Sequence, residues 1–190
     1  MSETIEIEFK NLLTKVGYEK LLNAFNVKDE QIISQTNHYF DTPDFTLKDL
    51  GSALRIREKN DHYEMTLKQP ADIGLLETTQ TLSKNEFLAA INTGILPKGI
   101  IQERLEQLNI LFTDLEYFGS LTTKRAEFPY NEGLLVLDHS LYLNTEDFEI
   151  EYEVLDFRRG QVAFKELLEQ YNIPIRITPN KIARFYQQKI

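Results

Sequence analysis

Charged or polar side chains recur at every second position in four separate stretches of this 190-residue chain. Residues at alternate positions share one face of a β-strand, so each stretch predicts a strand with a charged face and an apolar face. Arginine and lysine bind phosphate oxygens, and carboxylates bind hard divalent cations. Together they predict a site for a polyanion held with a metal. The stretches are Glu6-Ile7-Glu8-Phe9-Lys10, Arg55-Ile56-Arg57, Glu64-Met65-Thr66-Leu67-Lys68 and Glu149-Ile150-Glu151-Tyr152-Glu153.

A single charged strand is ordinary, because one face of an antiparallel sheet is often solvated. Several such faces of both signs are better explained by a shared ligand. Carboxylates gathered in one place repel one another unless a cation lies between them, which predicts a bound divalent ion. The acidic candidates are Glu6, Glu8, Asp138, Glu149, Glu151 and Glu153, and the basic ones are Lys10, Arg55, Arg57, Lys68, Arg125, Lys181 and Arg184.

The elements that would position these residues are mostly strands. Period-two alternation predicts about eight of them, and an antiparallel meander fits best. The segment Lys59-Asn60-Asp61 lies between two alternating runs and predicts a hairpin turn. The expected strands are residues 4–10, 35–41, 52–59, 62–68, 75–82, 115–128, 133–138 and 148–155.

Helices are predicted between and after these strands. An apolar stripe of Val16, Leu21, Leu22 and Phe25 indicates one helix, and Ser83 with Glu86 forms a capping box that begins a second. Two more are expected at residues 98–110 and 158–171, the latter with Val162, Phe164, Leu167 and Leu168 on one side, and a short one follows Pro179. The helices are too few for alternating strand and helix units. The prediction is an α+β fold: an eight-stranded antiparallel β-barrel with a charged interior, its apolar face turned outward onto flanking helices.

Composition narrows the class of protein. The length and 42% hydrophobic content suit a single domain spanning residues 1–190. A net charge of −9 disfavours binding to nucleic acid polymers, and the lack of cysteine excludes disulfides and thiolate chemistry. No run of 18 apolar residues and no leader pattern are present, so neither membrane insertion nor export is expected and the predicted location is cytoplasmic.

These residues also form a recognisable series. The charged stretches, together with Tyr39-Phe40-Asp41-Thr42, Arg125, Asp138 and Lys181-x-x-Arg184, resemble the CYTH domain, or triphosphate tunnel metalloenzyme, superfamily in order along nearly the whole chain. The likeness is to small stand-alone bacterial members described as adenylate cyclases or triphosphatases. One departure is the segment Leu75-Leu76-Glu77-Thr78-Thr79-Gln80, where many relatives carry several charges and this chain keeps only Glu77.

The resemblance implies an eight-stranded tunnel that binds a small triphosphate-containing molecule with Mg²⁺ or Mn²⁺. It implies that Lys10, Arg55, Arg57, Lys68, Arg125 and Lys181 bind the triphosphate, to which Arg184 is added, and that Glu6, Glu8, Asp138, Glu149 and Glu151 hold the metal, with Glu153 as a further ligand. We expect Glu8, Lys10 and Arg57 to be catalytic. A monomer and a homodimer are both compatible with the sequence.

The leading functional hypothesis is metal-dependent hydrolysis of a triphosphate such as tripolyphosphate, a nucleoside triphosphate or thiamine triphosphate. Either a second metal ion or a carboxylate such as Glu8 would activate the attacking water. Two alternatives stay open: a class IV type adenylate cyclase, and a noncatalytic sensor of polyphosphate or a nucleotide.

Overall fold

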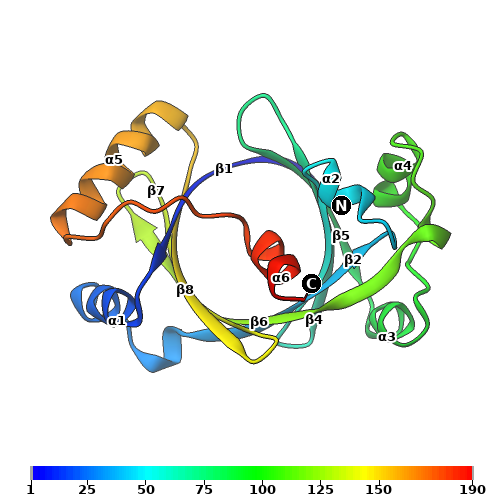
Figure 1. Ribbon diagram of the computed structural model, residues 1–190, viewed down its shortest axis with the longest axis horizontal. Helices are drawn as coiled ribbons and strands as arrows, with labels where there is room; N and C mark the ends of the chain where they lie inside the picture. Colours follow the sequence, from blue (N-terminus) through cyan, green and yellow to red (C-terminus); the bar gives the residue numbers. More distant parts are fainter. Residues whose placement is uncertain (1, 190) are drawn as a thin grey trace. The chain divides into compact units, whose positions relative to one another are not determined.

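The computed structural model describes residues 2–189 and contains a closed eight-stranded antiparallel barrel flanked by helices (Figure 1). The predicted α+β barrel is confirmed. The strands are β1 (Ser2–Leu13), β2 (Ile33–Asp41), β3 (Ala53–Lys59), β4 (His62–Pro70), β5 (Leu75–Leu82), β6 (Glu116–Tyr130), β7 (Gly133–Tyr142) and β8 (Thr145–Val154). The helices are α1 (Lys15–Ala24), α2 (Thr46–Asp49), α3 (Lys84–Thr93), α4 (Ile100–Glu106), α5 (Phe157–Gln170) and α6 (Lys181–Lys189), with 3₁₀ turns at Asp29–Gln31 and Phe112–Asp114.

The strand order corrects the simple meander. Neighbouring strands follow the order β1-β5-β4-β3-β2-β6-β7-β8, so β2 to β5 and β6 to β8 are meanders, but β1 lies between β5 and β8. Pairing β1 on both sides leaves no free strand edge, which closure of a barrel requires. Between residues 2 and 189, none of the helices is both long enough and apolar enough to cross a membrane.

The chain divides into two compact units. Among the described residues, unit 1 consists of residues 2–5 and Gln35–Leu121. Unit 2 consists of Glu6–Ser34 and residues 122–189. In each unit we call the strand face that carries the apolar core the outer face, and the opposite one the inner face.

Unit 1 has its apolar core on the outer face of β3, β4 and β5. Leu54 and Ile56 of β3 are fully buried there, and α3 and α4 pack over β4 and β5 (Figure 1). The expected hairpin is confirmed, because Lys59 pairs with His62 and the two residues between them have positive φ angles of 50° and 57°. Such angles fit a type I′ turn, which the asparagine and aspartate at these positions favour.

Helix ends in unit 1 follow the local sequence. The Ser83 hydroxyl accepts a hydrogen bond from the Glu86 amide and the Glu86 carboxylate accepts one from the Ser83 amide, so the predicted capping box begins α3. The helix expected at 98–110 is shorter than predicted, because α4 covers only Ile100–Glu106. The short α2 was not predicted; the buried Asp41 carboxylate accepts hydrogen bonds from the amides of Thr42, Leu47 and Lys48 and fixes its position.

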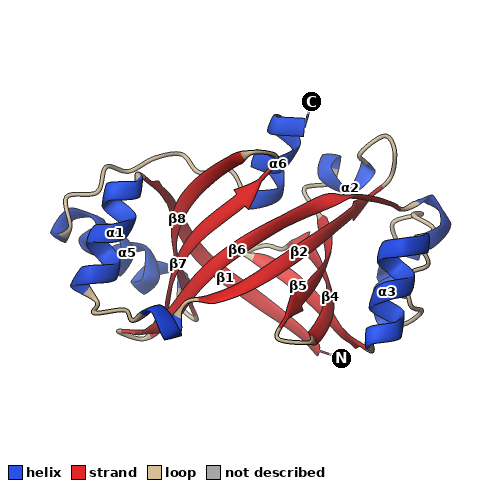
Figure 2. Ribbon diagram, turned by 90° about the horizontal axis from the view of Figure 1, so that it is seen from below, coloured by secondary structure: helices blue, strands red, loops and turns tan. Residues whose placement is uncertain are grey.

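Unit 2 places its core between the outer face of β6, β7 and β8 and the helices α1 and α5, which cover β8 (Figures 1 and 2). Phe164, Leu167 and Leu168 of α5 are buried as expected. Two predicted core residues are wrong: Val16 is 74% exposed and Val162 is 57% exposed. Both Val16 and Tyr18 lie in the first turn of α1, and the side that turns toward the core carries Tyr18 and Leu21, not Val16.

The last helix contacts the other side of unit 2. The expected helix after Pro179 is α6, and Figure 2 shows it beside the ends of β7 and β8. An extended segment leads to it from α5 and is held along β1, where the Asn11 side chain bonds Pro174 and Arg176. The segment therefore leads α6 to the charged inner face, away from the apolar core.

Candidate functional site

Three carboxylates line the inner face of unit 2 and are almost completely buried. Asp138 and Glu149 have no exposed surface and Glu151 is 5% exposed. Strand alternation explains why these carboxylates lie on the inner face. Leu137, Ile150 and their apolar neighbours on β7 and β8 point the other way, into the core on the outer face. The strand register pairs Asp138 with Glu149, so the acidic groups come from adjacent strands.

Two cations lie among these carboxylates. The Arg125 guanidinium donates to both oxygens of Asp138, at 2.8 and 2.6 Å, and to Glu151 at 2.7 Å. The Lys181 ammonium, which α6 brings to the strands, lies 2.8 Å from Asp138 Oδ2, 2.9 Å from Glu149 Oε1 and 2.5 Å from Glu151 Oε1. The fold therefore brings five of the predicted site residues into contact.

The buried carboxylates keep the Arg125 guanidinium and the Lys181 ammonium protonated. Burial lowers the pKa values of Arg125 and Lys181, but the surrounding carboxylates outweigh burial and raise both pKa values well above their ordinary range. Burial alone would raise the pKa of Asp138, and Arg125 and Lys181 lower it overall. Burial and the nearby negative charge of Glu151 raise the pKa of Glu149 to about 7, despite Lys181. Of the three carboxylates, only Glu149 therefore has a pKa near neutral pH, since the neighbouring cations lower the pKa values of Asp138 and Glu151.

A second acidic group lies where β1 pairs with β8. Glu8 is opposite Glu153 and Lys10 is opposite Glu151 in the strand register, and the Lys10 ammonium forms an ion pair with Glu8. Burial raises the pKa of Glu153 to about 7, and the charges of Glu6, Glu151 and Glu8 add to that effect. The carboxylates of β1 therefore add to the negative charge around Glu153.

Unit 1 has its own charged inner face. Arg55 and Arg57 of β3 alternate with the buried core residues, and Lys68 of β4 forms a 2.5 Å ion pair with Glu77 of β5. The Arg57 Nε donates to the Asn37 Oδ1 at 3.0 Å. The three predicted charges of unit 1, Arg55, Arg57 and Lys68, therefore share one face of the sheet, as their spacing and strand register require.

Two residues that contact the predicted set were missed in the sequence. Asp147 on β8 accepts hydrogen bonds from the Arg184 guanidinium at 2.8 and 3.2 Å, and Tyr142 donates to the same aspartate at 2.7 Å. Asp147 has the same parity as Glu149, Glu151 and Glu153, so the alternation could have identified it. No sequence signal pointed to Tyr142.

Comparison with known proteins assigns the chain to a family. The family model described as "CYTH domain" matches residues 4–186. The chain belongs to the CYTH domain family. A curated CYTH relative, "Putative triphosphatase YjbK" of Bacillus subtilis (strain 168), is 50% identical over 189 residues, which cover 100% of this chain and 98% of the relative.

Solved structures agree with the CYTH fold. A crystal structure described as a "putative adenylate cyclase" from Bacillus halodurans is 44% identical, with a TM-score of 0.95 over 98% of this chain and 100% of that one. A protein from Hippeastrum, described as a "putative adenylyl cyclase HpAC1" that "reveals a dominant" triphosphatase activity, superposes with a TM-score of 0.81 over 98% of this chain and 97% of its own. At 24% identity it supports the fold alone.

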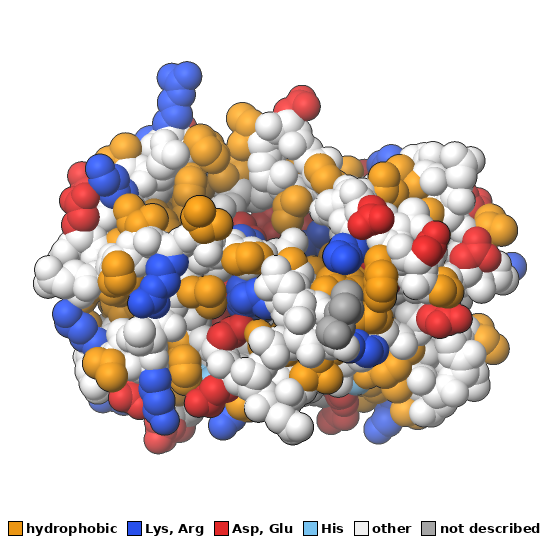
Figure 3. Space-filling model, in the orientation of Figure 1, with side chains coloured by type: hydrophobic (Ala, Val, Ile, Leu, Met, Phe, Trp, Pro, Cys, Tyr) orange, Lys and Arg blue, Asp and Glu red, His pale blue; other side chains and the backbone are white. Residues whose placement is uncertain are grey.

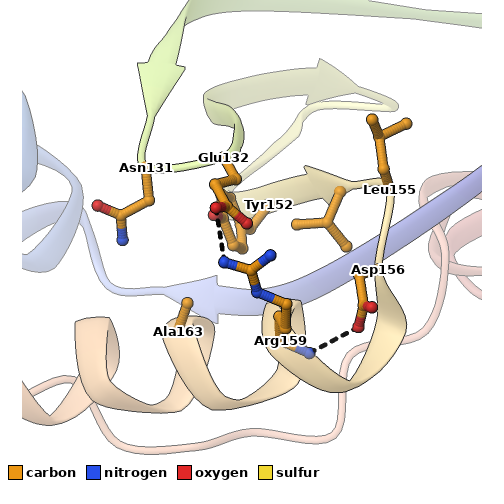
Figure 4. A pocket seen from close by; sticks show the side chains of 9 residues that line it. Asn131, Glu132, Tyr152, Leu155, Asp156, Arg159 and Ala163 are labelled. Carbon is orange, nitrogen blue, oxygen red and sulfur yellow. Dashed lines mark hydrogen bonds and ion pairs between the residues drawn. The ribbon is translucent and has the colours of Figure 1, made fainter.

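A surface groove lies apart from the predicted site residues. A groove of about 720 Å³ lies between the turn after β6 and the start of α5, and the exposed Arg159 forms an ion pair with Glu132 across it (Figure 4). None of its lining residues belongs to the charged set predicted for the CYTH site. On the face shown in Figure 3, basic and acidic side chains are interspersed.

Proposed function

We propose that this protein is a metal-dependent triphosphatase, which hydrolyses a phosphoanhydride bond of a small triphosphate-containing substrate. The observation that carries the proposal is the buried network of unit 2, in which Arg125 and Lys181 are held charged beside three carboxylates. Fixed cations in a buried position stabilise the charge that develops on a transferring phosphoryl group. The curated relative at 50% identity, which bears the name "Putative triphosphatase YjbK", supports this proposal.

The carboxylates of unit 2 fit a divalent cation. Three carboxylate oxygens already converge on one positive atom, the Lys181 Nζ, and hard oxygen donors suit Mg²⁺ and Mn²⁺. Within residues 2–189, no three metal-ligating side chains are already arranged around a common metal position, and the cations Arg125 and Lys181 lie between the carboxylates. We propose as ligands Glu6, Glu8, Asp138, Glu149, Glu151 and Glu153. When bound, the metal would supply Lewis-acid stabilisation of phosphate oxygens.

The basic side chains of unit 2 would bind and orient the triphosphate. Lys10, Arg125 and Lys181 offer ammonium and guanidinium donors on the inner face. Glu8 is our candidate for the group that accepts the proton of the attacking water, because it lies on the same strand face as Lys10. The contribution of Arg55, Arg57 and Lys68 of unit 1 to substrate binding stays a prediction from the sequence.

The test is a turnover assay with product identification. Purified protein is incubated with tripolyphosphate, ATP or thiamine triphosphate and with Mg²⁺, Mn²⁺ or Ca²⁺, and orthophosphate release is measured. Glu8→Ala and Arg57→Ala should each abolish the activity of a folded protein, whereas Glu146→Ala and Arg159→Ala, which alter exposed ion pairs elsewhere, should retain it. Wild-type rates in either of the first two variants would contradict the proposal.

Adenylate cyclase activity is the second candidate, favoured by the 44% identical structure described as a "putative adenylate cyclase". The same triphosphate site would serve this reaction if a ribose hydroxyl attacked the α-phosphorus. Incubation with ATP separates the two reactions: cyclic AMP with pyrophosphate indicates the cyclase, and orthophosphate indicates the hydrolase. Binding of tripolyphosphate, ATP and thiamine triphosphate without turnover of any of them under all three metals would contradict both.

A further inference from the structure

Asp147 occupies the first position of the acidic row on β8 but has a different set of contacts from the rest of that row. Its strand register pairs it with Ser140, and its side chain is 17% exposed. No ion pair joins it to Lys181 in the described structure, whereas Glu149 and Glu151, two and four residues later, contact that lysine directly. Both carboxylate oxygens of Asp147 instead face Arg184 of α6.

Tyr142 fixes the orientation of this carboxylate. Its hydroxyl donates to Asp147 Oδ2 at 2.7 Å, and its ring, which is 8% exposed, lies 5.9 Å from the Phe185 ring of α6. The turn between β7 and β8 is tight, with φ angles of 45° at Leu143 and 63° at Asn144. Tyrosine and aspartate therefore belong to one rigid hairpin, which presents a prepared acceptor to the helix.

Most of the N–H donors of the Arg184 guanidinium bond to protein groups, chiefly to Asp147. Its Nε and Nη2 form a fork to Asp147, its Nη1 donates to the Pro179 carbonyl at 2.6 Å, and Nη1 also lies 2.5 Å from Glu149 Oε2. A fork of two parallel N–H donors fixes direction as well as distance. The side chain is only 7% exposed. This guanidinium is thus committed to protein groups, which suits a structural role better than direct contact with phosphate.

Lys181 depends on the same helix. It precedes Arg184 by three residues, so the two side chains project from the same side of α6 about one turn apart. Holding Arg184 at the hairpin therefore sets where the Lys181 ammonium lies among Asp138, Glu149 and Glu151.

We propose that Asp147, oriented by Tyr142, is a positioning residue that anchors Arg184 and so keeps Lys181 of α6 at the acidic face of unit 2. Its effect on substrate affinity rests on the proposed triphosphatase function, whereas the anchoring of α6 does not. The anchor acts through the helix and touches neither substrate nor metal.

The expected kinetic effect falls on KM. If Asp147→Ala lowers the fraction of molecules with α6 in place to about one tenth, the apparent affinity for tripolyphosphate falls about tenfold, because only the competent fraction binds. Turnover of the bound complex, measured as kcat, should change by less than about threefold, since the bound substrate again selects the docked helix. Tyr142→Phe removes one hydrogen bond and keeps the ring, so KM should rise roughly fivefold or less.

Hydrogen exchange of the full-length protein, free of metal and substrate, gives a readout that does not need activity. The amides of α6 should exchange faster in Asp147→Ala, and to a smaller extent in Tyr142→Phe, while those of β7 and β8 keep their protection. The control is Glu146→Ala, the adjacent residue on β8, whose carboxylate pairs with His139 and is 48% exposed. It should leave both the exchange of α6 and KM unchanged.

The outcomes separate the two parts of the proposal. Faster exchange of α6 together with a raised KM supports it, and wild-type exchange in both Asp147→Ala and Tyr142→Phe overturns it. Faster exchange with an unchanged KM overturns the link from the anchor to substrate binding. If the wild-type protein hydrolyses no triphosphate, the proposed function fails, and the exchange data alone decide whether Asp147 anchors α6. Because Tyr142→Phe preserves the packing of the ring, it keeps the test valid if Asp147→Ala does not fold.

Discussion

Replacing Arg125 with methionine tests whether the buried charges of unit 2 also stabilise the fold. Arg125 donates to Asp138 at 2.8 and 2.6 Å and to Glu151 at 2.7 Å, and the three side chains are 11%, 0% and 7% exposed. Methionine retains the apolar bulk but leaves both carboxylates without this partner. Breaking a buried ion pair from one side costs about 3–5 kcal/mol of unfolding free energy, because a buried charge is left uncompensated.

For a chain of this size, each kcal/mol lowers Tm by about 2–4 °C, so the Arg125→Met variant should melt roughly 6–20 °C below the wild type. Thermal unfolding is followed by circular dichroism at neutral pH without added metal, and urea unfolding gives the free energy independently. The loss should shrink on acidification, because protonation neutralises the carboxylates that the arginine no longer accompanies.

Arg159→Met is the matched control. Its ion pair with Glu132 has the same 2.6 Å distance as the shortest contact of Arg125, but the two side chains are 69% and 66% exposed. Exposed pairs contribute about 0–1 kcal/mol, so Tm should fall by no more than about 4 °C. Equal and small losses in the two variants would refute the reasoning that burial gives the Arg125 network its stabilising effect.

Three further changes test particular elements. Gly160→Ala should destabilise the protein and lower its Tm, because a Cβ there would come within 2.5 Å of Val154 where α5 meets β8; an unchanged Tm would contradict that close contact. Ser83→Ala should cost about 1 kcal/mol by removing the N-cap of α3, as measured by urea unfolding. Burial lowers the pKa of His38 below 6.5 despite the nearby Glu58, so the unfolded chain binds more protons in acid and stability falls as pH drops below about 6.5. His38→Gln should therefore lose less Tm than the wild type between about pH 7 and about pH 5, and an identical pH dependence would exclude this role of the histidine.

Much of the fold could be read from local patterns. The Asn60-Asp61 turn, the capping box that begins at Ser83 and the helix after Pro179 each depend on a few neighbouring residues, and all three occur as predicted. The predicted burial of Val16 and Val162 was wrong. Whether a helical residue is buried depends on which part of its helix faces the sheet, and not only on its spacing.

Charged candidates for the site were predicted in the same way. Alternation indicates which side chains share a strand face, and it singled out Glu149 and Glu151 before their register was known. Alternation and spacing could not distinguish side chains that bind a ligand from side chains that form ion pairs within the protein. Arg184 was assigned to substrate binding from its place beside Lys181, whereas the structure shows it bonded to Asp147, and its direct contact with substrate stays a prediction.

The sequence by itself determined the strands, their charged and apolar faces and the family, because these depend on residue type at a period of two and on motifs in order along the chain. Only the tertiary structure decided that β1 lies between β5 and β8, and that Lys181 reaches Asp138, 43 positions earlier in the numbering. Strand partners and the path of α6 are set by closure of the barrel and by contacts between distant segments, and no local periodicity encodes either of them.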